Sequence, residues 1–382
     1  MCTKDLKGVN GLSTHSKLKK EGIEIIKKLD PSKVNKIAVN VASKLCLAFP
    51  EHDLKRSELF ESLSNLSMYI AKMPEDSSGA KYFYKNNSIY FNEIFDVEEM
   101  SKLAVHECIH FIQNSNNSDR MGLYNSSSNF GLGLNEAAVQ LMASEANFAE
   151  NANETYYGIS LNTISPDYYP LQCTLVNQIA YFTGTYPLFH STLTGNDIFK
   201  NTFIVKSDKK VYNTIIKNLD KLLVLENNLN CFALELEYAD KISSIKHLNK
   251  LINKYKSEIK SLFFKTQNLI MEKCFKSDFN NIRNDDDIKN FSKKLYNFKN
   301  IIGYSDEYSF YNVFYRKMMS AVQEKKIYIE KYGELNLFEN INNSLMIVDN
   351  TRNAFSFISI LITKCKKLIG LNKSGEKIND WL

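Results

Sequence analysis

The stretch His106-Glu107-Cys108-Ile109-His110 contains the pattern H-E-x-x-H, which combines residue types that can hold a metal ion and move a proton. On a helix, positions i and i+4 lie one turn apart on the same face. The imidazoles of His106 and His110 can therefore each offer one nitrogen to a single Zn²⁺. Glu107 follows the first ligand and can reach a zinc-bound water, whose pKa the metal lowers to about 7. The pattern predicts a zinc hydrolase with Glu107 as general base.

The type of third ligand separates the families of such enzymes. The extended pattern HExxHxxGxxH is absent, because Gln113 and Asn116 stand at its Gly and His positions. The segment 133–138, Gly-Leu-Asn-Glu-Ala-Ala, places Glu136 in the first turn of a predicted helix. This resembles the gluzincin pattern, in which the third ligand is a glutamate on a second helix. The resemblance implies one Zn²⁺ per chain, held by His106, His110 and Glu136.

Glu136 also fits a second role, because an acid in the first turn of a helix interacts favourably with the helix dipole. Glu145 is the other acid nearby on the same predicted helix, and it is the weaker candidate for a ligand.

The elements around the motif can be read from local signals. Asp96 is followed three residues later by Glu99, which is a capping-box arrangement, and it predicts a helix over 97–114 that contains H-E-x-x-H. A polar loop over 115–129 precedes the second helix, expected over 134–149 because of its Ala, Leu and Met content. Upstream, aromatic and β-branched residues over 80–84 and 88–92 predict a β-hairpin.

In this order of elements, residues 79–145 resemble the active-site core of the thermolysin-like gluzincin metallopeptidases. The resemblance implies a zincin-like lobe that hydrolyses peptide bonds in a peptide or protein substrate. It also implies that the substrate backbone adds as an extra strand along 79–84, in agreement with the behaviour of exposed strand edges. The chain departs from the family in two places. The loop before Glu136 is longer than usual, and Gln140 stands where the family often has an aspartate that orients the first histidine.

The resemblance implies one further catalytic part, a Tyr or His that stabilises the oxyanion. His190 is the first candidate, although a histidine there equally fits a core or surface position without a chemical role. The other candidates are tyrosines near the motif in sequence, namely Tyr124, Tyr156, Tyr157 and Tyr186.

For the whole chain we expect the α+β class. A basic tail over 1–30 precedes a zincin-like lobe over 31–205, with a small antiparallel sheet and the active-site helix, and an all-helical lobe follows over 206–382. Residues 151–170 look like a loop, and 171–188 form an apolar segment. The remaining helices are expected over 34–49, 54–73, 211–225, 242–274, 287–302, 308–332 and 352–369.

Composition excludes several classes of function. The net charge of +5 on 382 residues is diffuse, so we expect no nucleic-acid partner. The N-terminus has no apolar signal region, and the apolar run over 354–363 is too short for a bilayer, so no membrane segment is expected. The seven cysteines are scattered, which favours free thiols and a cytoplasmic location. The sequence leaves the oligomeric state and the cleavage specificity open.

Two other functions stay open at this point. The chain can be an interaction protein in which an old peptidase site is weak or inactive and the helical half binds a partner. It can also be a zinc hydrolase that acts on a non-peptide amide. A peptidase requires an intact Glu107 and a cleft open to water, whereas an interaction protein requires neither.

Overall fold

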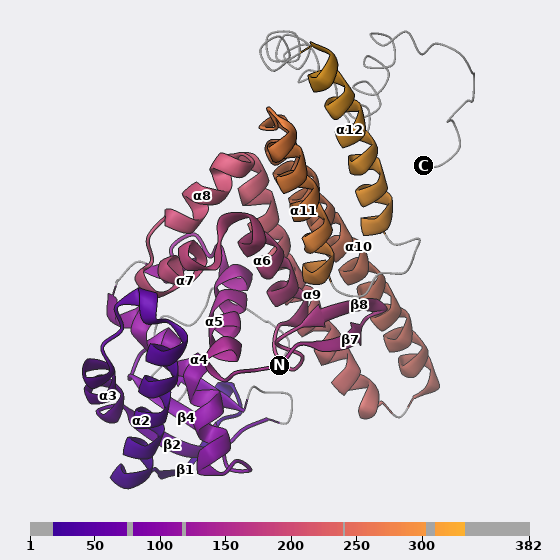
Figure 1. Ribbon diagram of the computed structural model, residues 1–382. Helices are drawn as coiled ribbons and strands as arrows, with labels where there is room; N and C mark the ends of the chain where they lie inside the picture. Colours follow the sequence, from indigo (N-terminus) through magenta and orange to yellow (C-terminus); the bar gives the residue numbers. More distant parts are fainter. Residues whose placement is uncertain (1–17, 75–78, 117–119, 240, 303–309, 333–382) are drawn as a thin grey trace. The chain divides into compact units, whose positions relative to one another are not determined.

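The computed structural model describes residues 18–74, 79–116, 120–239, 241–302 and 310–332. These residues are mostly helical, with small sheets near the N-terminus and in the middle of the chain (Figure 1). This content confirms the α+β class. The chain divides into two compact units. The first consists of 1–271 with 301–304, and the second consists of 272–300 with 305–382.

The largest sheet has four strands in the order β1-β2-β4-β3. The predicted hairpin is confirmed as β3 and β4, which pair antiparallel, but β2 and β4 are parallel. The sheet is therefore mixed, and the prediction of an antiparallel sheet was wrong. The strands are β1 (Glu24–Lys28), β2 (Ser67–Lys72), β3 (Ala80–Phe83) and β4 (Ser88–Asn92).

Strand β2 explains two differences from the sequence prediction. The helix expected over 54–73 ends early, as α3 (Arg56–Ser64), and its second half is β2. A short apolar run cannot be assigned to helix or strand by its period alone, and here pairing with distant segments decides it. One of these segments is β1, which pairs antiparallel with β2, so the expected loose tail does not extend to residue 30.

Two helices of the first unit begin with side-chain caps. In α2 (Pro31–Ala48) the Asp30 carboxylate accepts from the Lys33 amide at 3.0 Å, and the short 3₁₀ helix η1 (Pro50–His52) follows. In α4 (Val97–Asn116) the capping box is confirmed. Asp96 accepts from the Glu99 amide at 2.9 Å, and the Glu99 carboxylate accepts from the Asp96 amide at 3.1 Å. Helix α4 packs on α2, α5, β3 and β4, so its H-E-x-x-H segment lies inside the first unit.

The segment 151–170, expected as a loop, contains a second hairpin. Its strands are β7 (Ala152–Tyr156) and β8 (Ile159–Thr163), joined by Tyr157 and Gly158. Both turn residues have positive φ, 54° and 75°, which suits a two-residue hairpin turn. The neighbouring elements are β5 (Arg120–Met121), β6 (Tyr124–Asn125), α5 (Leu132–Ala146), α6 (Pro170–Thr183), α7 (Thr185–Thr194) and α8 (Ile198–Lys206).

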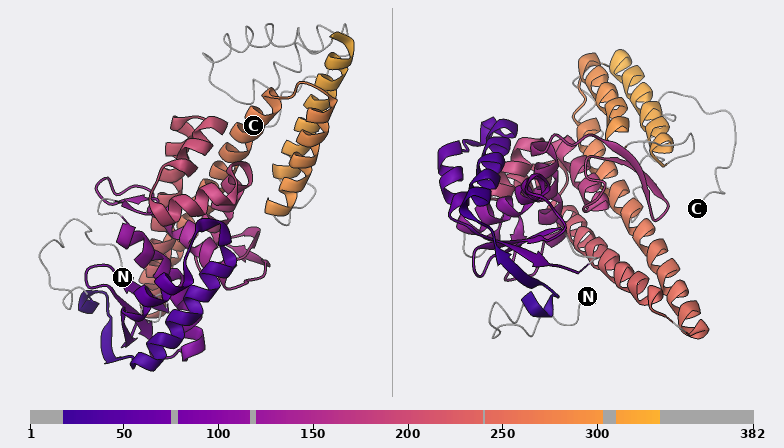
Figure 2. Two further views of the ribbon diagram at one scale, coloured as in Figure 1. Left: turned by 60° about the vertical axis from the view of Figure 1, so that its left-hand side comes forward. Right: turned by 90° about the horizontal axis from the view of Figure 1, so that it is seen from below.

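The long helices after residue 205 are confirmed in the described range. Helix α9 (Lys209–Glu237) packs on α5 and α6 in the first unit, and α10 (Ile242–Asn280) runs antiparallel to it, with Lys221 paired to Glu258 at 2.6 Å (Figure 2). The units therefore divide within α10 rather than near residue 205.

The second unit is helical throughout its described part. It contains the end of α10, α11 (Asp285–Ile302, apart from its last residues) and α12 (Phe310–Tyr332), joined by a cluster of aromatic rings around Phe275. The helix expected over 352–369 lies outside the described residues. Across the described helices, none combines the length and the apolar character that a membrane crossing needs.

A half-buried carboxyl group at the α6–α9 contact makes the stability of the first unit depend on pH. Glu226 accepts a hydrogen bond from the Gln172 amide, and burial raises the pKa of Glu226 from 4.5 to about 7. The native state therefore keeps a proton that the unfolded chain releases, so stability falls as pH rises from about 4.5 to 7.

We predict that Glu226→Gln removes this loss. The variant should be more stable than the wild type by on the order of 3 kcal/mol at pH 8 and by less than about 1 kcal/mol at pH 5. Urea unfolding at the two pH values measures the difference. Glu237→Gln, which changes an exposed carboxylate on the same helix, is the control and should shift neither value. Equal stability of Glu226→Gln and wild type at pH 8 contradicts the prediction.

Candidate metal centre and active site

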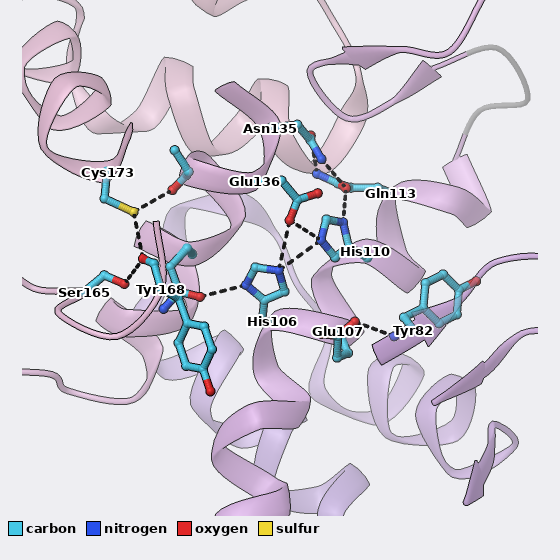
Figure 3. Close-up of polar contacts among 12 residues, drawn as sticks. Tyr82, His106, Glu107, His110, Gln113, Asn135, Glu136, Ser165, Tyr168 and Cys173 are labelled. Carbon is cyan, nitrogen blue, oxygen red and sulfur yellow. Dashed lines mark hydrogen bonds and ion pairs between the residues drawn. The ribbon is translucent and has the colours of Figure 1, made fainter. Parts of the chain in front are cut away.

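Three acceptor atoms from two helices converge at one point. Nε2 of His106 lies 3.1 Å from Nε2 of His110, and Oε2 of Glu136 lies 3.5 Å from each of them (Figure 3). The two histidines come from α4 and the glutamate from the first half of α5. The structure thus brings together the three residues that the sequence predicted as ligands.

These distances fit a zinc ion. A tetrahedral zinc with nitrogen and oxygen ligands at about 2.0–2.1 Å holds its ligand atoms about 3.4 Å apart. The site is also largely removed from water, since the side chains of His106, His110 and Glu136 are 15%, 9% and 14% exposed. The donor set and its spacing therefore suit one Zn²⁺.

Each imidazole has a hydrogen-bond partner on its far side, and for His110 this partner sets the tautomer. Nδ1 of His110 lies 3.0 Å from Oε1 of Gln113, whose Nε2 donates to the backbone oxygen of Thr192 at 3.0 Å. Because a backbone carbonyl only accepts, the orientation of the Gln113 amide is determined, and Nδ1 of His110 must donate. Nε2 of His110 then carries a lone pair that faces the other two acceptors.

Gln140 is the corresponding partner of His106. Its Oε1 lies 2.8 Å from Nδ1 of His106, and its Nε2 is 3.2 Å from Oγ of Ser144. This is the position where the resemblance led us to look for an aspartate. The amide orients the ring without adding a negative charge.

Three facing acceptors repel one another unless a cation or proton lies between them. Burial by itself lowers the pKa of His110, but the carboxylates of Glu136 and Glu107 reverse this and raise it to about 9. Burial likewise tends to raise the pKa of Glu136, and the imidazoles of His110 and His106 bring it well below its usual range. A proton on His110 thus balances the charge in the metal-free chain.

A buried polar network connects α4, which carries the two histidines, with α5, which carries Glu136. Oδ1 of Asn135 accepts from Nε2 of Gln113 and from the backbone amide of Leu123, each at 3.0 Å. Gly122 makes room for this network, because a Cβ atom there would lie 2.2 Å from Nε2 of Gln113. Asn135, the residue before Glu136, therefore also supports His110 through Gln113. The sequence prediction missed Gln113 and Asn135 in this role.

Glu107 lies beside the three ligands and contacts the sheet. Its Oε2 accepts a hydrogen bond from the backbone amide of Tyr82 at 2.5 Å. Tyr82 belongs to β3, an edge strand of its sheet. The amide thus points outward from the sheet, and it holds the carboxylate where an extended peptide can pair with the edge.

The ligands and Glu107 open into a cavity of about 750 Å³. The cavity is large enough for several residues of a peptide. Its walls come from β3, α4, α5, the segment 164–169 and α9, which contributes Leu223 and Asn227.

Tyr169 is a site residue that the sequence prediction missed. Its hydroxyl forms a hydrogen bond with Glu136, and its ring lies nearly parallel to that of His106 with centroids 6.3 Å apart. The Glu136 carboxylate, then burial and Glu107, raise the pKa of Tyr169 well above its usual range, so it keeps its proton. The sequence gives only a weak signal for this role. Pro170 after Tyr169 marks the start of a helix, but it does not show that Tyr169 lies near His106.

The earlier candidates for oxyanion stabilisation lie elsewhere. His190 stacks on Tyr186 with centroids 5.3 Å apart and on His52 at 5.9 Å. Tyr124 donates to Asn129, and Tyr156 donates to the backbone oxygen of Pro166. Neither His190 nor any of the four predicted tyrosines lines the cavity.

The chain was compared with models of protein families, with curated proteins and with solved structures, and none of the three comparisons found a match. The gluzincin resemblance therefore rests on the motif and the geometry around it, and the zincin-like lobe remains a prediction.

We predict that Gln140 controls metal affinity. Gln140→Ala should weaken Zn²⁺ binding at least tenfold, because removal of such a partner typically costs about 10–100-fold. Gln140→Glu is nearly isosteric and adds charge, so it should bind at least as tightly as wild type. Competition with a chromophoric chelator measures the Zn²⁺ affinity of both variants. Ser144→Ala, which removes the hydroxyl that contacts Nε2 of Gln140, is the control. Wild-type affinity in Gln140→Ala contradicts the assigned role.

Proposed function

We propose that this chain is a zinc-dependent metallopeptidase of the gluzincin kind. The observation that carries the proposal is the convergence of His106, His110 and Glu136 at spacings of 3.1, 3.5 and 3.5 Å, which suit a tetrahedral zinc ion. Glu107 lies beside them on the cavity wall.

Each residue has a distinct role in the proposed reaction. His106, His110 and Glu136 would hold Zn²⁺, which would supply a bound water with a pKa of about 7 and would polarise a carbonyl group. Glu107 accepts the proton released when water attacks the scissile carbonyl and returns it to the leaving nitrogen. Tyr169 keeps its proton and donates a hydrogen bond to the oxygen that gains negative charge.

The edge strand supports a peptide as the substrate. An extended chain that pairs with β3 receives backbone hydrogen bonds along its length, and this brings one of its carbonyl groups to Glu107. The 750 Å³ cavity accommodates the flanking side chains. A non-peptide amide would use the same catalytic groups but would gain nothing from the strand.

The first test separates the base from the ligands. Glu107→Gln should retain Zn²⁺ because Glu107 is not a ligand, and it should lose at least about 10²–10⁴-fold in hydrolysis because an amide cannot accept the proton. His110→Ala should lose both the metal and the activity, because two remaining ligands bind zinc weakly. A peptide-library cleavage assay beside elemental analysis measures both properties.

The outcomes distinguish the alternatives. Equal peptide cleavage by wild type and Glu107→Gln rules out the mechanism even if zinc is present. Absence of metal in the wild type, also after zinc is added, rules out the metal centre. Zinc without peptide cleavage favours the amide hydrolase or the interaction protein, and in the latter Glu107→Gln leaves partner binding unchanged.

The second test concerns Tyr169. Tyr169→Phe keeps the ring but removes the hydroxyl, so kcat for peptide cleavage should fall about 10²-fold, while zinc content stays at the wild-type level. His190→Phe is the matched control and should leave kcat within about twofold, because His190 does not line the cavity. A larger loss of kcat in His190→Phe than in Tyr169→Phe contradicts the assignment.

A further inference from the structure

Helix α5 carries Glu136 but lacks a cap of its own. Its N-cap residue is Gly131, with φ of 90°, and no side chain at this end of α5 accepts a hydrogen bond from its first turn. The first amides of a helix have no partner within the helix, and they need acceptors where they are removed from water.

Asp220 supplies these acceptors from a distant part of the chain. It lies on α9, and its Oδ2 accepts from the amide of Gly131 at 2.9 Å while Oδ1 accepts from that of Gly133 at 2.8 Å. The amide of Leu132 also contributes to the same carboxylate. The negative charge lies at the positive end of the α5 dipole, so hydrogen bonding and electrostatics act together.

The two helices are in backbone contact at this point. A Cβ atom on Gly133 would lie 2.6 Å from the backbone oxygen of Leu219, the residue before Asp220. Gly133 therefore allows α5 to approach α9 closely enough for the carboxylate to reach the amides. The contact lies within the first compact unit.

This end of α5 is also the part that builds the metal centre. Glu136 follows Gly133 by three residues, and Asn135 holds Gln113, which orients His110. Any shift or fraying of the first turn of α5 therefore moves Glu136 directly, and it moves His110 indirectly through Asn135 and Gln113.

We propose that Asp220 is a positioning residue for the metal centre. From the neighbouring helix α9 it caps α5 and keeps the first turn of α5 ordered before metal binds. The inference rests on the proposed function, because it assigns Glu136 as a ligand. Without the cap, zinc binding must order this turn, and the free energy of ordering is subtracted from the affinity.

The test compares two cap residues on the same helix. Asp220→Ala should weaken Zn²⁺ binding about five- to tenfold, the range that corresponds to the loss of a helix cap. Asp208→Ala is the matched control, because the Asp208 carboxylate caps α9 itself by accepting from the Val211 amide at 2.7 Å. Chelator competition should give the control an affinity within about twofold of wild type. Asp220→Asn, which keeps one of the two acceptor oxygens and loses the charge, should lie between the wild type and Asp220→Ala.

A second readout does not require metal. Hydrogen exchange of the metal-free full chain should be faster at Gly131 and Gly133 in Asp220→Ala, and unchanged there in Asp208→Ala. Equal zinc affinity of Asp220→Ala and Asp208→Ala, or unchanged exchange at these amides, overturns the inference. If the wild type binds no zinc, the proposal of a metal centre is wrong, and the exchange measurement still decides whether Asp220 caps α5. If Asp220→Ala does not fold, Asp220→Asn carries both measurements.

Discussion

The close approach of His106, His110 and Glu136 is the constraint on which the surrounding structure depends. Three electron-pair donors at 3.1–3.5 Å repel one another, so this arrangement requires a proton or a cation among them and support behind each group. The supports differ in kind. Gln113 and Gln140 orient the rings by hydrogen bonds, and Asn135 links the two helices through Gln113.

Helix α5 connects most of these supports. It carries Asn135 and Glu136 on one turn and Gln140 on the next, and its start is held by α9 through Asp220. The long helix α9 therefore contributes to the site as well as to the bulk of the first unit. Helix α9 caps α5 and provides Leu223 and Asn227 to the cavity wall.

The segment that follows the second hairpin positions Tyr169. After β8 the chain is held by two hydrogen bonds, from Tyr156 to the oxygen of Pro166 and from Ser165 to the oxygen of Tyr168, each at 2.5 Å. The chain then enters α6 at Tyr169, whose φ of 52° is uncommon for a residue with a side chain. Residues in such conformations persist where their surroundings hold them, often beside functional sites. Here the conformation directs Tyr169 toward Glu136.

Local patterns in the sequence were enough to predict the helix over 97–114, which the structure extends to Asn116, the hairpin over 80–92 and the histidine pair, whereas Glu136 was proposed from the gluzincin resemblance. A capping box, a turn between β-prone runs and an i, i+4 histidine pair act over a few residues, so neighbours along the chain decide them. The tertiary structure decided the rest. Strand β2 exists because β1 and β4 pair with it, and the roles of Gln113, Tyr169 and Asp220 depend on contacts between elements far apart in sequence. Such contacts form only when the whole unit packs, and no local pattern records them.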